Sequence, residues 1–310
     1  MAKFKIIANP SAGHGKGERA IPEIEQELRG LNLDFNLVRT ERPLHGIELA
    51  RQAALEGVEV VVAAGGDGTV NEVLNGLIEA RKTSQNRPAL GVLCTGRGND
   101  FAACLRIPAD LAGGCRVLQG NRRRLIDIGH VVGGKYPQGR FFANTVGVGF
   151  DAIGTIQVAK LPDWGMLSFL IAILKTILLY YRGPKVRIDY DSQSLTSSTL
   201  MFLTMNGQRM GTGFQMAPEA QPDDGWFDLV LVRQVSRTRI LSLIPHFLKG
   251  TQATQPEIST QRAAKVSITA LEGVLPAQTD GEILCVDGTR LDIQLLPRQV
   301  EVVCPKEVGA

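Results

Sequence analysis

The feature that most constrains this chain is an almost wholly apolar run, Val58–Ala64, that is followed at once by glycine-rich sequence. A short run this rich in valine is typical of a parallel strand that is buried on both faces. The next residues, Gly65-Gly66-Asp67-Gly68-Thr69, include three glycines, which let a backbone approach a ligand closely. With a helix predicted from Val70 to Glu79, the loop amides and the helix N-terminus predict a phosphate site.

The first 125 residues repeat this strand–loop–helix pattern. Repeats of this size predict a parallel sheet covered by helices, and such sheets bind ligands at the carboxyl ends of their strands. The other expected strands are Phe4–Ala8, Leu33–Val38 and Leu90–Cys94, and the other expected helices are Glu18–Leu28 and Gly46–Glu56.

Two further loops follow strands at the same predicted edge. Residues 9–17 are glycine-rich but lack a Walker A motif, because Gly17 stands where Ser or Thr should follow Lys16. Arg97 lies between two glycines, where a guanidinium is suited to clamp a nucleotide phosphate; a solvated surface arginine is the alternative. Asn99-Asp100 is interpreted as part of this loop or as a cap of the next helix.

Asp67 needs a separate explanation. A carboxylate beside a phosphate is repulsive unless a cation lies between them, and Mg²⁺ prefers carboxylate, water and phosphate oxygens. The sequence therefore predicts Mg²⁺ at Asp67. The alternative is a tight strand-to-helix turn that binds no ligand.

After about residue 125 short strand patterns dominate and predict a mainly antiparallel β-sandwich. A helix is predicted from Arg237 to Lys249, with Ser236 as its N-cap and Gly250 just past its end. Residues 192–199 are expected to be a polar loop. The expected strands are Phe141–Val146, Val186–Tyr190, Leu200–Met205, Phe227–Val232, Val266–Thr269, Leu291–Leu295 and Val300–Val303.

A second helix is predicted over Trp164–Tyr181. It has no charged residue before Lys175, and its apolar run is too short to span a bilayer. Two interpretations stay open. The helix either packs against the sandwich, or its surplus apolar surface meets lipid with Trp164, Tyr180 and Tyr181 at the water boundary.

Composition excludes several classes of protein. With 34 basic and 31 acidic residues the net charge is only +3, so no nucleic-acid partner is expected. The five cysteines are odd in number and widely spaced, which fits neither a disulfide framework nor a zinc site. The chain starts with a strand pattern and has no long apolar segment there, so a cytoplasmic protein is expected.

Taken together, the motifs resemble those of the diacylglycerol kinase-type lipid kinases, a family that also includes sphingosine and ceramide kinases. The resemblance covers nearly the whole chain and is greatest to the soluble bacterial diacylglycerol kinase and YegS-like branch. NAD kinases and phosphofructokinases share only the short glycine–aspartate core. Besides Gly65–Val73, the motifs are Asn9-Pro10, Gly98–Ala102, Phe142–Asn144, Gly147–Ala152, Met205–Gly207, Ala217–Phe227 and Asp280–Glu282.

The resemblance implies a nucleotide-binding α/β domain over residues 1–125, to which residues 297–310 return, and a β-sandwich lipid-substrate domain over residues 126–296. ATP would be the phosphoryl donor. Arg97 stands where many members have a threonine expected to touch the nucleotide. The nucleotide-binding residues implied are Asn9, Thr40, Gly65, Gly66, Asp67, Gly68, Thr69, Asn71 and Arg97.

The resemblance also implies that Asp280 is the catalytic base, brought to a cleft between the domains. The loop at Gln221–Trp226 would hold a structural Mg²⁺ through the Asp224 carboxylate and the backbone carbonyls of Gln221 and Trp226. From the residues alone, Asp280-Gly281 equally suits a hairpin turn, and Asp287-Gly288 is assigned to a turn.

Two charged clusters also have alternative interpretations. Asp223-Asp224-Gly225 suits a plain turn, but adjacent carboxylates with no Lys or Arg near them in sequence favour a cation. Residues 122–124, three arginines, are assigned to a solvated loop, with contact to anionic lipid headgroups as the alternative.

The expected function is therefore an ATP-dependent lipid kinase, with diacylglycerol converted to phosphatidic acid as the first candidate. The alternatives are a soluble-substrate kinase of the NAD kinase type, or a catalytically silent regulator that binds nucleotide or lipid. The expected partner is a lipid at a membrane surface, with peripheral contact on the inner face of the cell membrane. A homodimer stays open.

Overall fold

The computed structural model describes residues 3–162, 164–180 and 182–306. The chain divides into two compact units. Unit 1 runs to Ile126 and resumes at Arg298, and unit 2 is Asp127–Pro297. Two long strands contain the boundaries: β5 (Arg123–Gly133) and β17 (Arg290–Val303).

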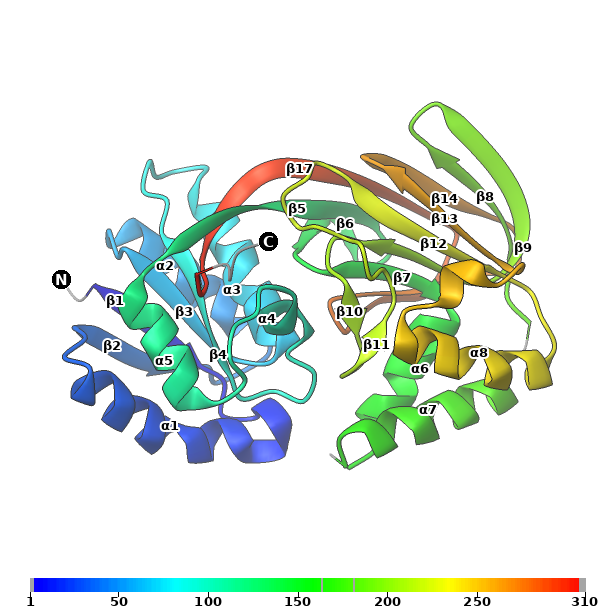
Figure 1. The fold of residues 1–310 in the computed structure, drawn as a ribbon. Helices are drawn as coiled ribbons and strands as arrows, with labels where there is room; N and C mark the ends of the chain where they lie inside the picture. The colour runs from blue at the N-terminus through cyan, green and yellow to red at the C-terminus, as the bar shows by residue number, and fades with distance from the viewer. Residues whose placement is uncertain (1–2, 163, 181, 307–310) are drawn as a thin grey trace. The chain divides into compact units, whose positions relative to one another are not determined.

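Unit 1 contains a parallel sheet in the strand order β2-β1-β3-β4, drawn in blue and cyan in Figure 1. Every residue of β3 is buried, as the apolar run predicted. The end of β17 adds to this sheet beside β4, with Val302 paired to Leu90 in parallel. The strands are β1 (Phe4–Ala8), β2 (Phe35–Arg39), β3 (Val60–Gly65) and β4 (Ala89–Cys94).

Helices cover both faces of this sheet (Figure 1). On one face, side chains of α1 and α5 share a core with Val60 and Val62. Helix α3 begins at Asp67 and not at Val70 as predicted, because the extended Gly66 caps it and an acidic residue is favourable in a first turn. The helices are α1 (Ala12–Gly30), α2 (His45–Leu55), α3 (Asp67–Ala80), α4 (Asp100–Cys104) and α5 (Leu111–Gly120).

Unit 2 is mainly antiparallel, so the predicted fold class is confirmed in both units. Two buried apolar clusters hold its strands, one around Phe142 and Phe227 and one around Leu203 and Met205. The strands are β6 (Tyr136–Phe142), β7 (Thr145–Gly149), β8 (Lys185–Tyr190), β9 (Gln193–Met205), β10 (Arg209–Met210), β11 (Phe214–Gln215), β12 (Phe227–Arg233), β13 (Ile258–Ala263), β14 (Lys265–Glu272), β15 (Leu275–Thr279) and β16 (Glu282–Gly288).

Four sequence-based assignments in this part of the chain were wrong. The polar segment 192–199 is mostly the first half of β9, a solvated strand that pairs with β8. The two strands expected at 291–295 and 300–303 are the single strand β17. Arg123 and Arg124 begin β5, where Arg123 pairs with Glu301 at 3.0 Å, and Asp287-Gly288 ends β16. Solvated strands carry polar residues that resemble loop sequence, which explains these errors.

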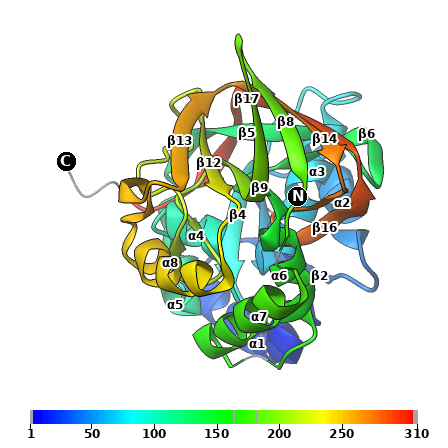
Figure 2. The same ribbon diagram turned by 90° about the vertical axis from the view of Figure 1, so that its right-hand side faces the viewer.

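The described residues of unit 2 contain three α-helices: α6 (Phe150–Ala159), α7 (Met166–Leu179) and α8 (Arg237–Lys249). Their apolar side chains join one core cluster, and they lie together beside the strands in both views (Figure 2). The predicted helix Trp164–Tyr181 is shorter at both ends, and Tyr181 lies outside the described residues. No helix in the described part of the chain is long and apolar enough to cross a membrane.

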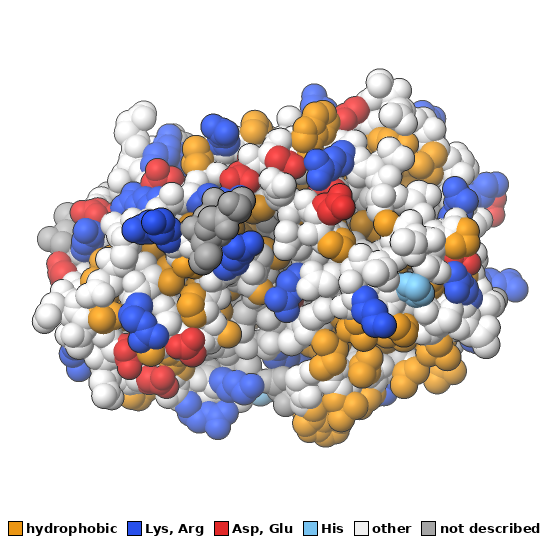
Figure 3. Space-filling model, viewed as in Figure 1, with side chains coloured by type: hydrophobic (Ala, Val, Ile, Leu, Met, Phe, Trp, Pro, Cys, Tyr) orange, Lys and Arg blue, Asp and Glu red, His pale blue; other side chains and the backbone are white. Residues whose placement is uncertain are grey.

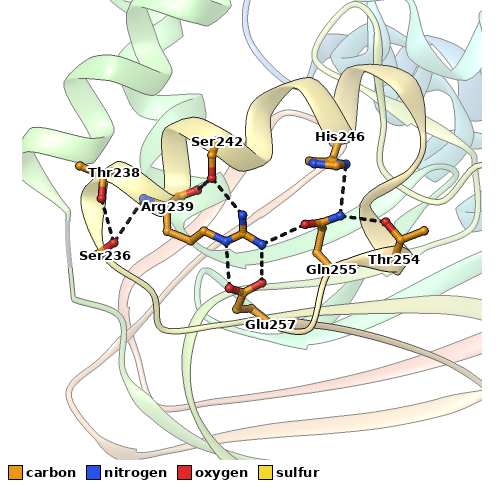
Figure 4. Close-up of polar contacts among 8 residues, drawn as sticks. All are labelled: Ser236, Thr238, Arg239, Ser242, His246, Thr254, Gln255 and Glu257. Carbon is orange, nitrogen blue, oxygen red and sulfur yellow. Dashed lines mark hydrogen bonds and ion pairs between the residues drawn. The ribbon is translucent and has the colours of Figure 1, made fainter.

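Helix α8 has the predicted bounds and caps. The Ser236 Oγ accepts from the Arg239 amide at 3.2 Å, and Gly250 adopts φ 72° just past the last turn. Two guanidinium nitrogens of Arg239 donate to the Glu257 carboxylate at 2.9 and 3.0 Å, next to Gln255 (Figure 4). This bidentate pair fastens the first turns of α8 to the segment that leads into β13.

The cap gives a stability prediction. Ser236→Ala should lower the free energy of unfolding by about 1 kcal/mol, because the Arg239 amide loses its acceptor. Ser236→Asp keeps an acceptor oxygen and should stay close to the wild type in the same urea titration. Equal stability of the alanine variant and the wild type would show that the cap contributes nothing.

Candidate active site

Three loops of unit 1 meet at the carboxyl ends of β1, β3 and β4. The Asn9 side-chain amide donates to the Thr69 hydroxyl at 3.0 Å. The amides of Thr95 and Gly96 donate to the Gly65 carbonyl at 3.0 and 3.2 Å. Residues expected from three separate motifs are therefore brought together at one edge of the sheet.

Glycine is needed here for loop packing. A Cβ on Gly96 would lie 2.2 Å from the Gly66 Cα, and a Cβ on Gly65 would lie 2.2 Å from the Thr69 hydroxyl. Neither position tolerates a side chain without movement of backbone or of a buried threonine. Gly66, Asp67 and Gly68 stay partly exposed, so the loop still presents backbone to solvent.

Asp67 has a structural role that the sequence analysis did not consider. Its Oδ1 accepts from the Phe101 amide at 3.0 Å and its Oδ2 accepts from the Asp100 amide at 3.2 Å. The carboxylate thus caps the short helix α4 from across the loops, whereas Asn99 makes no side-chain cap hydrogen bond. A negative charge at a helix N-terminus is favourable, so Asp67 does not require a cation to be stable in its place.

The remaining predicted nucleotide contacts differ in their surroundings. Thr40 follows β2, and its amide donates to the Ala8 carbonyl at 2.8 Å at the same sheet edge. Arg97 is partly exposed within the β4–α4 loop. Asn71 is fully buried, and its side-chain oxygen accepts from Asn75 at 3.1 Å, so the structure does not bring that side chain to the loop surface.

One loop residue was missed from the sequence. The Thr95 hydroxyl is buried and has no hydrogen-bond partner among the described residues, although the Thr95 amide donates to the Gly65 carbonyl. A buried hydroxyl without a partner is costly. The only sequence signal was its place directly after β4, before Gly96.

In unit 2, Asp280 lies in the tight turn between β15 and β16. Thr279 pairs with Glu282, and Asp280 and Gly281 adopt φ 45° and 85°, the positive values of a type I′ hairpin turn. The carboxylate accepts from three backbone amides at 2.9–3.0 Å, those of residues 143, 144 and 145, and the residue is 5% exposed. The hairpin interpretation therefore describes the backbone, and the side chain organises the bend between β6 and β7.

The same bend is held from a second direction. The Asn206 side-chain amide donates to the carbonyls of Asp127 and Ala143 at 3.0 and 2.8 Å, and its backbone amide donates to Asn144. Asn206 is fully buried. The motifs at 142–144, 205–207 and 280–282 are thus one hydrogen-bonded cluster, which their spacing in the sequence did not reveal.

The side chains of Gln278 and Asp151 form a hydrogen-bonded pair that supports the Asp280 turn. The Gln278 amide nitrogen donates to Asp151 Oδ2 at 2.7 Å, and its oxygen accepts from the Gly281 amide at 2.8 Å. Burial raises the pKa of Asp151 to about 6, and the Gln278 hydrogen bond opposes that rise. Position 147 requires glycine, because a Cβ there would lie 1.8 Å from the same Asp151 oxygen.

The loop Gln221–Trp226 is tied to β5 through Asp127, whose Oδ2 accepts from the Gly225 amide at 2.7 Å. Asp224 accepts from the Trp226 amide at 3.0 Å and lies 3.4 Å from Arg262. No basic residue lies near Asp224 in sequence, but the fold brings Arg262 of β13 to it, so this carboxylate has a cationic neighbour that the sequence did not indicate. The described residues contain no group of three or more His, Cys, Asp or Glu side chains arranged to hold a metal.

Solved structures of other proteins have a similar fold. A diacylglycerol kinase from Bacillus anthracis has a TM-score of 0.73 at 22% identity, over 99% of this chain and 98% of that chain. An NAD kinase from Archaeoglobus fulgidus has a TM-score of 0.51 at 12% identity, over 98% and 94%. The chain thus has an NAD kinase-like fold of two units, with glycine-rich loops at the sheet edge of its α/β unit.

Sequence comparison makes the assignment specific. The family model described as "Diacylglycerol kinase catalytic domain" matches residues 3–131, and that described as "YegS C-terminal NAD kinase beta sandwich-like domain" matches residues 144–304. A diacylglycerol kinase from Bacillus subtilis (strain 168) is 30% identical over 313 residues, which cover 99% of this chain and 98% of that protein. The chain belongs to the bacterial diacylglycerol kinase family, which confirms the resemblance drawn from its motifs; it is a lipid kinase of the diacylglycerol kinase type.

The buried Asp151 gives a pH prediction. An aspartate in an unfolded chain has a pKa near 3.9, so between about pH 4 and pH 6 the unfolded state releases this proton before the folded state does. Ionised Asp151 therefore costs stability above pH 6, by up to about 3 kcal/mol. Asp151→Asn can still accept from Gln278 but cannot ionise. Its stability relative to the wild type should rise between pH 4.5 and pH 7.5.

The measurement is urea unfolding of the wild type and of Asp151→Asn at both pH values. An Asp151→Asn effect that is the same at both pH values would show that this carboxyl is not perturbed by burial.

Proposed function

We propose that this chain transfers the γ-phosphoryl group of ATP to the hydroxyl of diacylglycerol and so forms phosphatidic acid. The observation that carries the proposal is the convergence of three loops, from Asn9, Gly65 and Gly96 onward, at one edge of the parallel sheet. That edge is where open α/β sheets bind their ligands. The substrate class comes from the family, whose Bacillus subtilis member is a diacylglycerol kinase.

The nucleotide phosphates would lie on the exposed backbone of residues 66–68 at the N-terminus of α3. Phosphoryl transfer passes through a loose transition state, so positioning and neutralisation of charge do most of the catalytic work. The α3 amides and the Arg97 guanidinium supply positive charge, and Asn9, Thr40 and Thr69 lie along the same edge. Mg²⁺ supplies further charge neutralisation when it is bound with the phosphates, and Asp67 places a carboxylate in the first turn of α3.

Asp280 would orient the acceptor hydroxyl. Three backbone amides fix its carboxylate in position, and a carboxylate is a weak base toward an alcohol. A weak but rigid acceptor suits a late proton transfer, after the new P–O bond has largely formed. In this proposal Gln278 and Asn206 are positioning residues, since each acts on the backbone around Asp280.

The loop at Gln221–Trp226 would hold a structural Mg²⁺ through the Asp224 carboxylate and the two terminal carbonyls. Carboxylate and carbonyl oxygens are donors that suit Mg²⁺. Beside this loop, Asp228 has a buried carboxylate oxygen with no hydrogen-bond partner among the described residues. Burial, opposed by Arg262, raises the pKa of Asp228. A cation would compensate that charge and rigidify the loop that contacts Asp127.

The catalytic assignment is tested with purified protein, [γ-³²P]ATP and diacylglycerol in mixed micelles. Asp280→Asn should lower kcat by at least about 100-fold, within the usual contribution of general acid–base groups, while ATP binding to unit 1 is kept. Asp287→Asn changes the other Asp-Gly pair of the same hairpin, is exposed, and should keep full activity.

Because Asp280 also holds the bend, its variant is compared with Asn206→Ala, which removes the second support of the same bend without touching the carboxylate. Loss of activity that tracks the melting temperature equally in both variants would assign Asp280 a structural role only. A wild type that phosphorylates NAD but no diacylglycerol would overturn the proposed substrate.

The metal assignment has a readout that does not depend on catalysis. Mg²⁺ should raise the melting temperature of the protein without nucleotide, because a ligand that binds only the folded state stabilises it. Asp224→Asn should lose this shift and Asp223→Asn should keep it. An equal shift in both variants would place the stabilising cation elsewhere.

A further inference from the structure

Large apolar side chains are concentrated on the surface of α7 and the segment before it. Trp164, Leu167, Leu174, Leu178 and Leu179 are each more than half exposed. In the space-filling view, apolar side chains gather at the lower right, where Figure 1 places α7 and α8 (Figure 3). Contiguous exposed apolar surface on a protein marks an interaction site more often than scattered single residues do.

The exposed leucines of α7 lie on a different side of the helix from the face that packs against unit 2. Leu167, Leu174 and Leu178 are spaced by seven and four residues and so lie on one side of the helix. Ala172 and Thr176, on the other side, are buried. The Thr176 hydroxyl donates to the Ala172 carbonyl at 2.7 Å, and the buried Ser168 hydroxyl donates to the Pro162 carbonyl at 2.6 Å, so both buried hydroxyls of α7 have local partners. The exposed leucines are therefore not needed for the core of unit 2.

The charges on these helices have one sign. Neither α7 nor α8 contains an Asp or Glu, and their charged residues are Lys175, Arg237, Arg239 and Lys249. Lys175 and Lys249 are exposed, whereas Arg239 is paired with Glu257. Helix α8 adds the exposed Leu241 and Leu248. Apolar and basic residues are thus interspersed, and an anionic, partly apolar partner matches both.

We propose that the exposed faces of α7 and α8, here called the docking face, bind the surface of an anionic lipid bilayer. The leucines enter the boundary between headgroups and acyl chains, Lys175 and Lys249 contact anionic headgroups, and Trp164 lies at the interface. At 14 residues, α7 is too short to span a bilayer and suits a helix lying in its plane. The inference rests on the proposed function, because a membrane holds the diacylglycerol.

Charge disfavours a second copy of the chain as the occupant. A two-fold dimer buries the same patch on both subunits. The docking face would then meet itself, with basic helices opposite basic helices and no acidic residue on either helix to pair with them. An anionic bilayer meets no such repulsion.

The test is flotation of the full chain with vesicles that contain no diacylglycerol, so that binding does not depend on the active site. Vesicles of phosphatidylcholine with about 30 mol % phosphatidylglycerol should bind the wild type more tightly than phosphatidylcholine alone, and salt should weaken this binding. Leu174→Glu with Leu178→Glu should weaken binding at least about tenfold, which corresponds to 1.4 kcal/mol. Lys175→Glu should reduce the preference for anionic vesicles.

The matched control is Leu271→Glu, which adds a charge at a similarly exposed leucine of unit 2 on β14. It should bind vesicles as the wild type does, and all variants should keep the wild-type melting temperature. Equal binding by the Leu174/Leu178 variant and the wild type would overturn the proposal. So would a wild type that sediments as a dimer, ignores vesicles, and becomes monomeric in the Leu174/Leu178 variant.

Activity separates this inference from the proposed function. With a short-chain diacylglycerol dissolved as monomers, the Leu174/Leu178 variant should phosphorylate as fast as the wild type, whereas on vesicles it should be slower. If the wild type phosphorylates neither form, the proposed function fails, and the flotation result still decides the docking face.

Discussion

The candidate nucleotide site depends on a contact between two stretches of backbone. The loop after β3 and the loop after β4 approach so closely that a Cβ on Gly96 would lie 2.2 Å from the Cα of Gly66. The Gly65 carbonyl accepts hydrogen bonds from two backbone amides of the second loop. The Asp67 carboxylate accepts hydrogen bonds from two amides of α4. The glycines therefore do two things: they let the loops pack together, and they leave the amides at the start of α3 near solvent.

Unit 2 uses a charged side chain for a comparable purpose. The Asp280 carboxylate accepts hydrogen bonds from the three amides of the bend between β6 and β7. Asn206 and Gln278 form hydrogen bonds with the neighbouring backbone. A buried carboxylate is tolerated only when hydrogen bonds compensate its lost hydration. The residue that we propose for the acceptor hydroxyl is thus also the residue that holds the neighbouring bend, so its proposed function is coupled to stability at this position.

The sequence was informative where burial is complete. Val58–Ala64 predicted a buried parallel strand, and the caps at Ser236 and Gly250 predicted both ends of α8, because these signals are local. It failed where a partner comes from a distant segment. The residues around Asp224 in sequence do not indicate its contact with Arg262. Those around Asp67 do not indicate its hydrogen bonds to the amides of α4. The first half of β9 was missed because a solvated strand lacks the apolar pattern on which the assignment relies.

The pairing of β17 with β4 has a consequence for how the protein is made. Val302, close to the end of the chain, pairs with Leu90, although all of unit 2 lies between them in the sequence. A ribosome releases the segments of β1 to β4 long before it releases this last strand. The edge of β4 thus stays open during translation, which is a hazard for strand-mediated association. This sheet closes only after β17 has been made, so a truncation that removes the end of β17 would harm the first half of the molecule.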